Sequence, residues 1–166
     1  MMNKRNARKR MMFIQKEYYN YLCYNLIIIL NNLGCTKESY QFKDFRKIAY
    51  LIDFISASKN IDDFSQDELG GIYSKVHIKK KLLSHLLIIL KNKDYLGISM
   101  NKTHKSFDIW LKIDNIPKTF FDKDIFYNEL DNFEILKTKI RGIRNTTIKT
   151  MVDKLFTSKN ILTWEI

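Results

Sequence analysis

The sequence is poor in the residues that interrupt regular structure, with one proline and five glycines among 166 residues. Proline ends helices and interior glycine weakens them, so this scarcity predicts long, uninterrupted elements. Hydrophobic residues make up 45% of the chain and aromatic residues 13%. A chain this apolar and this long can bury a real core, which excludes an intrinsically disordered protein.

Cysteines and long apolar runs are also scarce. The two cysteines, Cys23 and Cys35, are too few for a disulfide framework or a zinc site, which favours a reducing, cytoplasmic compartment. The most apolar run, Leu26–Leu30, is far shorter than the roughly 18 residues of a membrane span. The basic N-terminus lacks the long apolar region of a signal peptide. We therefore expect a cytoplasmic protein without a membrane partner.

Catalytic signatures are missing as well. The chain has neither a G-x-x-x-x-G-K-[ST] phosphate loop nor a G-x-S-x-G nucleophile elbow. His77, His85 and His104 are scattered and far from both cysteines, so they do not form a metal-ligand set. Glu134 and Lys137 are spaced as a helical ion pair, unlike the clustered carboxylates of a metal nuclease. We expect no enzyme, no cofactor and no metal.

Positive charge, in contrast, is abundant: 29 lysines and arginines face 18 acidic residues, for a net charge of +11. Such a charge attracts polyanions, of which nucleic acid is the commonest. An acidic protein surface or membrane headgroups would also serve, and an AT-rich genome would give the same lysine excess. The charge alone leaves these alternatives open.

The densest positive charge lies in a basic arm, residues 1–12, which contains no acid and five cations: Lys4, Arg5, Arg8, Lys9 and Arg10. Flexible arms of this kind follow phosphates without reading sequence. A solubilising tail, or a helix extension that meets an acidic partner, is an equal alternative. A weaker second patch comprises Arg141, Arg144 and Lys149.

Apolar residues at helical spacing predict three helices in the first part of the chain. The first begins between Phe13 and Tyr18 and ends before Gly34, the second covers about residues 42–55, and the third about 73–91. Ser65–Glu68 matches a capping box ahead of the third helix. A hairpin follows within residues 95–113, where apolar and polar residues alternate around a basic turn.

In the second strand of this hairpin, Phe107, Ile109 and Leu111 are expected to face the core, and Asp108 and Trp110 to face away. After a break at Pro117, helices are predicted near residues 123–140 and after a Thr146 or Thr147 cap. Residues 160–166 are apolar enough for a terminal strand.

The predicted fold is mainly α with a small β-hairpin, a winged-helix-like domain over residues 13–116 with a C-terminal helical extension over 117–166. In a winged helix, the helix before the hairpin often contacts the major groove and the wing contacts the backbone. Many winged helices bind only proteins. The DNA-contact candidates are Lys79, Lys80 and Lys81 on the third helix and Lys102 and Lys105 in the turn.

Four apolar residues are candidates for a protein interface. Tyr50, Leu51 and Phe54 lie outside the expected buried stripe of the second helix, and this apolar surplus favours a subunit of a complex. An outward-facing Trp110 would add an indole to the contact surface. Alternatively, the C-terminal helices or the terminal strand cover Trp110.

The stretches "NLIIILNNLG", "FRKIAYLIDFIS", "LLSHLLIILKNKDYLGI" and "MVDKLF" resemble the middle component of bacterial ABC-three-component systems, the Lamassu-type anti-phage operons. The resemblance covers roughly residues 20–157 and consists of hydrophobic patterns. It implies a non-catalytic adaptor between an SMC-like ABC ATPase and an effector such as a nuclease, with auxiliary contacts to double-stranded DNA. A stand-alone winged-helix transcriptional regulator is the alternative, favoured by the net charge, the basic arm and the hairpin.

Overall fold

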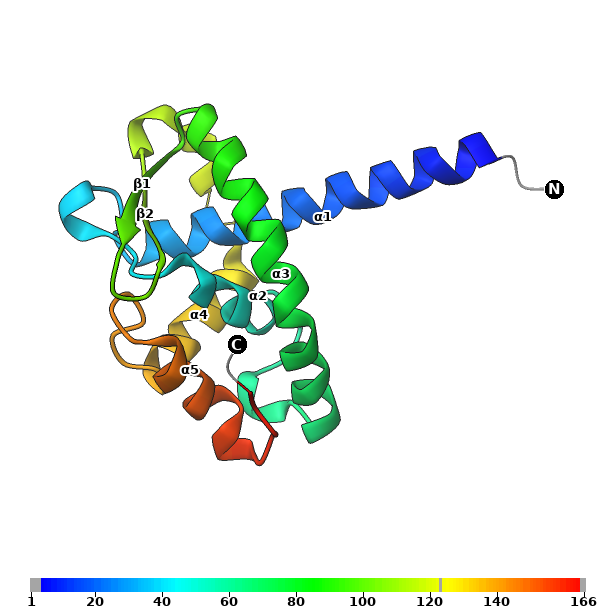
Figure 1. Cartoon of the computed structure of the whole chain (residues 1–166), viewed down its shortest axis with the longest axis vertical. Coiled ribbons are helices and arrows are strands. Elements are labelled where there is room, and N and C mark those ends of the chain that lie inside the picture. Colours follow the sequence, from blue (N-terminus) through cyan, green and yellow to red (C-terminus); the bar gives the residue numbers. More distant parts are fainter. Residues whose placement is uncertain (1–3, 123, 165–166) are drawn as a thin grey trace.

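The computed structural model describes the backbone of residues 4–122 and 124–164 and the side chains from residue 18 onward (Figure 1). This part of the chain is mostly helical, with one antiparallel hairpin, which confirms the predicted fold class; the winged-helix assignment stays a prediction. The elements are α1 (Lys4–Asn32), α2 (Ile48–Ile55), α3 (Gln66–Asn92), β1 (Leu96–Asn101), β2 (Ser106–Leu111), α4 (Tyr127–Lys139) and α5 (Ile148–Leu155).

Helix α1 begins much earlier than its apolar periodicity predicts. It starts at Lys4, so residues 4–12 of the basic arm are helical, and its N-terminal half extends away from the body of the molecule (Figure 1). The side chains of Lys4, Arg5, Arg8, Lys9 and Arg10 lie outside the described residues. Lysine, arginine and methionine are good helix formers and no glycine or proline intervenes, so the sequence favours a helix over residues 4–12.

Helix α2 is the centre of the core. It contacts α1, α3 and α4, and seven of its eight residues are buried: Ile48, Ala49, Tyr50, Leu51, Ile52, Phe54 and Ile55. The expectation that Tyr50, Leu51 and Phe54 form a partner surface is therefore wrong. The sequence prediction assumed that one face of α2 is exposed to solvent. In the structure α2 is enclosed on nearly every side, so the apolar residues beyond the predicted stripe pack within the chain.

Helix α3 is longer than predicted because its capping box works as the sequence indicates. The Glu68 N–H donates to Ser65 Oγ at 3.2 Å, and the Ser65 N–H donates to Glu68 Oε2 at 3.0 Å. The helix begins at Gln66 and continues through Gly70 and Gly71. Capping and packing of the helix against α2 therefore outweigh the roughly 1 kcal/mol that each interior glycine costs.

The hairpin pairs β1 with β2 in a register that places Met100 opposite Phe107. Ile109 and Leu111 are buried as predicted. The expected alternation fails nearer the turn, because Asp108 is only 4% exposed whereas Phe107 is 43% exposed. The cause is the loop before α2, which lies along β2 and bonds to it: the Phe42 N–H donates to the Ile109 carbonyl at 2.8 Å.

The C-terminal helices share the core of the preceding residues. Side chains after Pro117 join the same buried cluster as α2, among them Phe133, Leu136, Met151 and Phe156. Thr147 caps α5, as predicted, by accepting from the Thr150 N–H at 3.2 Å. The expected terminal strand is not formed in residues 160–164; instead, the Tyr73 hydroxyl accepts from the Trp164 N–H at 2.9 Å and donates to the Trp164 carbonyl at 2.5 Å.

Candidate nucleic-acid interface

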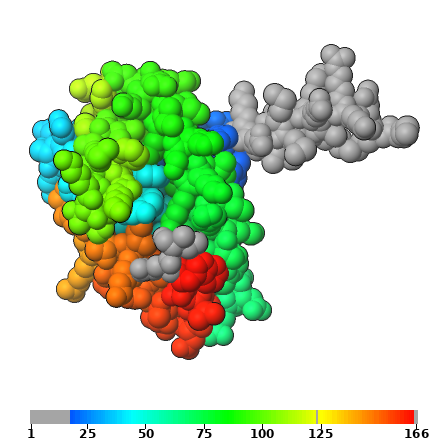
Figure 2. All heavy atoms as spheres, in the orientation of Figure 1, coloured from blue at the N-terminus to red at the C-terminus, as the bar shows by residue number. Residues whose placement is uncertain are grey.

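A basic groove runs along one side of α3. Two adjoining hollows of about 250 and 340 Å³ share Arg46, Tyr50 and Lys80. We call them together the α3 groove, whose cations and histidines are Arg46, His77, Lys80, Lys81, His104 and Lys149. Figure 2 shows that the hairpin and α3 lie on the same face of the molecule. The groove therefore collects permanent positive charge from α3, the loop before α2 and α5, and the hairpin turn contributes His104 to its lining.

Among the residues that the structure describes, those lining the groove include four permanent cations and one carboxylate, Asp44. Arg46 donates two hydrogen bonds to this carboxylate, from Nε to Oδ1 at 2.8 Å and from Nη2 to Oδ2 at 2.7 Å. Burial of Asp44 acts to raise its pKa, but the hydrogen bonds from Arg46 and Ser106 outweigh burial and hold that pKa below its usual value. Asp44 is thus a charged anchor that orients Arg46.

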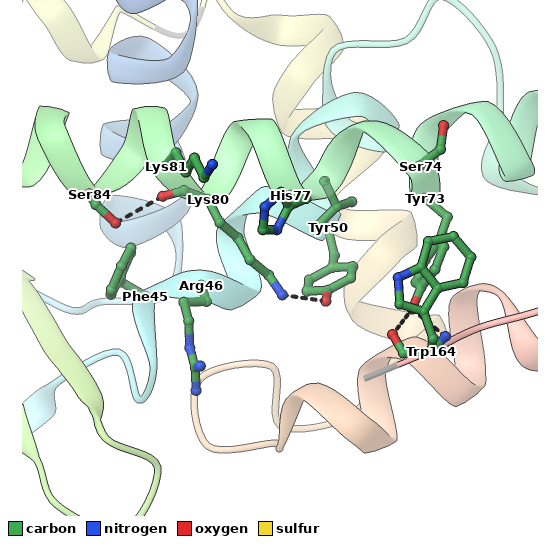
Figure 3. A pocket seen from close by; sticks show the side chains of 11 residues that line it. Phe45, Arg46, Tyr50, Tyr73, Ser74, His77, Lys80, Lys81, Ser84 and Trp164 are labelled. Carbon is green, nitrogen blue, oxygen red and sulfur yellow. Dashed lines mark hydrogen bonds between the residues drawn. The ribbon is translucent and has the colours of Figure 1, made fainter. Parts of the chain in front are cut away.

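Lys80 lies across the floor of the groove. Its Nζ donates to the Tyr50 hydroxyl at 2.7 Å and lies 4.7 Å from the centre of the Tyr50 ring (Figure 3). Tyr73 and Trp164 close one end with an edge-to-face ring contact at 5.0 Å. Lys81 and Lys149 are exposed at the margins. The groove thus receives cations from three segments of the chain, a lining that suits a polyanion.

Lys79 is a correction to the predicted DNA contacts. It is 3% exposed and forms an ion pair with Asp53 of α2. Successive residues on a helix point about 100° apart, so the side chain next to the groove-facing Lys80 points into the core. The Tyr21 hydroxyl contacts Ser56 Oγ and lies 3.5 Å from Asp53 Oδ1. This polar cluster joins α1, α2 and α3 and is not available to a ligand.

Lys102 and Lys105 lie in the exposed hairpin turn, as predicted. Arg46 connects the turn to the α3 groove, because its Nη2 donates to the His104 carbonyl at 3.2 Å. The described backbone and side chains thus bring Lys80, Lys81, Lys102 and Lys105 to one face, together with two cations that the sequence analysis did not combine with them, Arg46 and Lys149.

Trp110 does not form the free outward surface that the alternation predicts. Its side chain is half-buried, and its indole covers Gly97, its partner in β1, so closely that a Cβ at residue 97 would overlap the ring. A glycine in a strand interior often marks a close approach of other atoms, and Gly97 was the sequence signal for this packing.

Lys47 is a second buried amine that the sequence analysis missed. It is fully buried, and Nζ donates to the Ile143 carbonyl at 2.6 Å and to the Arg144 carbonyl at 3.0 Å. Burial lowers the pKa of Lys47 to about 7. The bonds tie the loop before α2 to the loop before α5, and so help to fix the position of Lys149 relative to Arg46.

The second basic patch is not a single surface. Arg144 stacks on Tyr40, with its guanidinium carbon 3.7 Å from the ring centre, whereas Lys149 lines the α3 groove. Arg141 is exposed and lines neither of the two hollows. Of this patch, only Lys149 belongs to the candidate interface.

Among the described side chains of residues 18–122 and 124–164, no group of three histidine, cysteine or acidic residues could hold a metal ion. In the same residues, no helix combines the length and apolarity needed to cross a membrane. No protein-family model, curated protein or solved structure matches the chain. The similarity to the middle component of ABC-three-component systems therefore stays a prediction.

Proposed function

We propose that the chain is a non-catalytic protein that binds double-stranded nucleic acid with its α3 groove and hairpin turn. The observation that carries this proposal is the convergence of cations from four separate segments on one face, where Arg46 bonds to both the groove carboxylate and the hairpin turn. Cations spaced along a groove match the regular phosphates of a duplex.

The side chains of this face favour contact with the backbone over reading of bases. Lysine acts as a point charge on phosphate, whereas base reading relies on bidentate donors such as arginine. The arginine at the centre of the face, Arg46, is already held by Asp44 in a bidentate pair. Binding should therefore depend strongly on salt and weakly on sequence.

The test is fluorescence anisotropy of a labelled duplex of mixed sequence, titrated at several salt concentrations. Lys81→Gln/Lys149→Gln removes two cations of the face without touching the Lys80–Tyr50 bond. We expect the slope of log K against log salt to fall by roughly two, since each phosphate contact contributes about 0.9.

The matched control is Lys118→Gln/Lys159→Gln, which removes the same charge from exposed lysines that do not line the groove. This control should lower affinity less and keep the slope. Equal effects of the two double variants would reject the α3 groove as the site, and absence of duplex binding at low salt would reject the function.

As a second candidate we propose an adaptor subunit of an anti-phage defence complex that couples an SMC-like ABC ATPase to an effector. Neighbouring apolar side chains on the outer surface of α3 support it, with Ile88 59% exposed and Ile89 45% exposed, because exposed apolar residues mark contact surfaces when they cluster. Co-purification with a coiled-coil ATPase encoded beside this chain is the expected result. A stable monomer with no such neighbouring gene would contradict it.

A further inference from the structure

The tip of the hairpin exposes two large apolar side chains side by side. Met100 and Phe107 are paired across the strands just before the turn, and they are 69% and 43% exposed. With Lys102 and Lys105 they line a shallow hollow at the tip. The Phe107 ring contacts Phe45 at 6.4 Å between centres, which leaves Met100 as the outermost apolar group.

The other side of the same tip is braced by buried hydrogen bonds. Asp108 Oδ1 accepts from the Asp44 N–H at 2.8 Å and from Asn101 Nδ2 at 3.0 Å. Ser106 Oγ donates to Asp44 Oδ1 at 2.9 Å. Asp44 and Asp108 are each 4% exposed, so these bonds lie away from water. The apolar pair is thereby held on a rigid support before any ligand binds.

The charges around the pair indicate the ligand. Lys102 and Lys105 are exposed beside it, and the two nearby carboxylates, Asp44 and Asp108, are buried and hydrogen-bonded. An apolar pair between exposed cations complements a ligand with an apolar interior and an anionic border. Stacked base pairs between two phosphate strands have that arrangement, and proteins that bend DNA insert phenylalanine or methionine between base steps.

We propose that Met100 and Phe107 form an apolar wedge that enters the minor groove of duplex DNA and unstacks one base step, while Lys102 and Lys105 contact the flanking phosphates. This inference rests on the proposed nucleic-acid binding and adds its mode: the bound duplex is kinked at the hairpin. Flexible pyrimidine–purine steps are unstacked most easily, so the wedge prefers them.

The experiment uses the full chain and a duplex of G·C pairs with one central TA step, in which 2-aminopurine replaces the adenine. Anisotropy of an end label reports binding, and 2-aminopurine fluorescence reports unstacking in the same titration. Saturating wild-type protein should raise the 2-aminopurine signal about two-fold or more, because a wedge opens the stack around the probe. A duplex without the TA step should bind more weakly.

Two variants test the wedge. Met100→Gln keeps the length of the more exposed side chain of the pair but removes its apolar character. Phe107→Ser removes the ring. At saturating concentration of either variant, the rise in 2-aminopurine fluorescence should be less than about half of the wild-type rise. A polar or short side chain cannot take the place of a base in the stack. If Phe107→Ser loses its fold by circular dichroism, Met100→Gln decides alone.

Lys102→Gln/Lys105→Gln is the matched control, because it should weaken binding yet reach the wild-type fluorescence at saturation. A saturated wild-type complex with unchanged 2-aminopurine fluorescence overturns the wedge, as does a Met100→Gln protein with the full signal. Either result leaves nucleic-acid binding itself intact, because the anisotropy still rises. A flat anisotropy curve for the wild type instead rejects the proposed function and the wedge with it.

Discussion

The side-chain amine of Lys47 donates a 2.6 Å hydrogen bond to the carbonyl oxygen of Ile143, which lies 96 residues later in the chain. A second bond reaches the neighbouring Arg144 carbonyl at 3.0 Å. A neutral amine has two N–H groups, so these two bonds can use both of its donors without a charge. The contact joins the loop before α2, which supplies Arg46 to the α3 groove, to the loop before α5, the helix that supplies Lys149.

The depressed pKa of Lys47 predicts a rise of stability with pH. Between about pH 7, its pKa in the folded protein, and about 10.5, its ordinary pKa, the unfolded chain keeps a proton that the folded chain has lost. The free energy of unfolding therefore increases with pH across this interval, by at most about 1.4 kcal/mol per pH unit. Urea unfolding from about pH 7 to 7.7 measures it while the thiols of the unfolded chain are still mostly protonated.

Lys47→Met isolates the effect, because it keeps an unbranched side chain and removes the titrating group. The slope of stability against pH should flatten in this variant and persist in Lys81→Met, an exposed control. The restricted range matters because burial raises the pKa of Cys35 to about 11, and ionisation of that thiol lowers stability as the pH rises above its ordinary pKa. An unchanged slope in Lys47→Met would assign the titration to another group.

The buried pair of Lys79 and Asp53 predicts an asymmetric pattern of mutations. Asp53→Ala leaves the Lys79 ammonium without its counter-ion and should cost about 2–3 kcal/mol, less than a fully buried pair because a quarter of the Asp53 side chain is exposed. Lys79→Met/Asp53→Leu should recover most of this loss, since apolar replacement of both partners leaves no charge buried. Urea unfolding of both variants is the measurement, and equal losses would contradict the argument.

The features that the sequence predicted correctly are governed by neighbours along the chain. The Ser65–Glu68 capping box, the Thr147 cap and the left-handed Gly34 after α1 all depend on contacts within a few residues. The hairpin and its buried Ile109 and Leu111 follow from simple alternation. Local rules of this kind are readable because the partner is always close in sequence.

The failures involve groups whose partners are distant. Asp108 was expected to face solvent, and its buried position depends on Asp44, 64 residues earlier. Lys79 was assigned to DNA, and its partner Asp53 lies 26 residues earlier. For the candidate site, periodicity could place Lys80 and Lys81 on α3, but only the tertiary fold brings Arg46 and Lys149 beside them. Asp53 is the single charged residue in the apolar segment Ile48–Ile55, and this isolated charge was the signal that a buried partner existed.

The reassignment of Phe54 from interface to core makes a prediction of its own. Phe54 is 2% exposed and contacts the rings of Phe64 and Phe156. Phe54→Ala should therefore lower the free energy of unfolding by about 3–5 kcal/mol, the cost of an aromatic cavity. Ile88→Ser, on the exposed surface of α3, should change it by less than about 0.5 kcal/mol. Similar losses of unfolding free energy in the two variants, measured by urea unfolding, would contradict a buried position for Phe54.

Gly97 and Trp110 predict a steric coupling inside the hairpin. A Cβ at residue 97 would overlap the Trp110 indole, so Gly97→Ala must displace the ring and should cost about 1–3 kcal/mol, as overpacking does. In a Trp164→Phe background, which leaves Trp110 as the chain's single tryptophan, the emission of the displaced indole should shift to longer wavelength. In the double variant Gly97→Ala/Trp110→Ser, the alanine should add almost no further loss to that of Trp110→Ser. Additive losses would show that Gly97 is required for its backbone and not for the space it leaves to the ring.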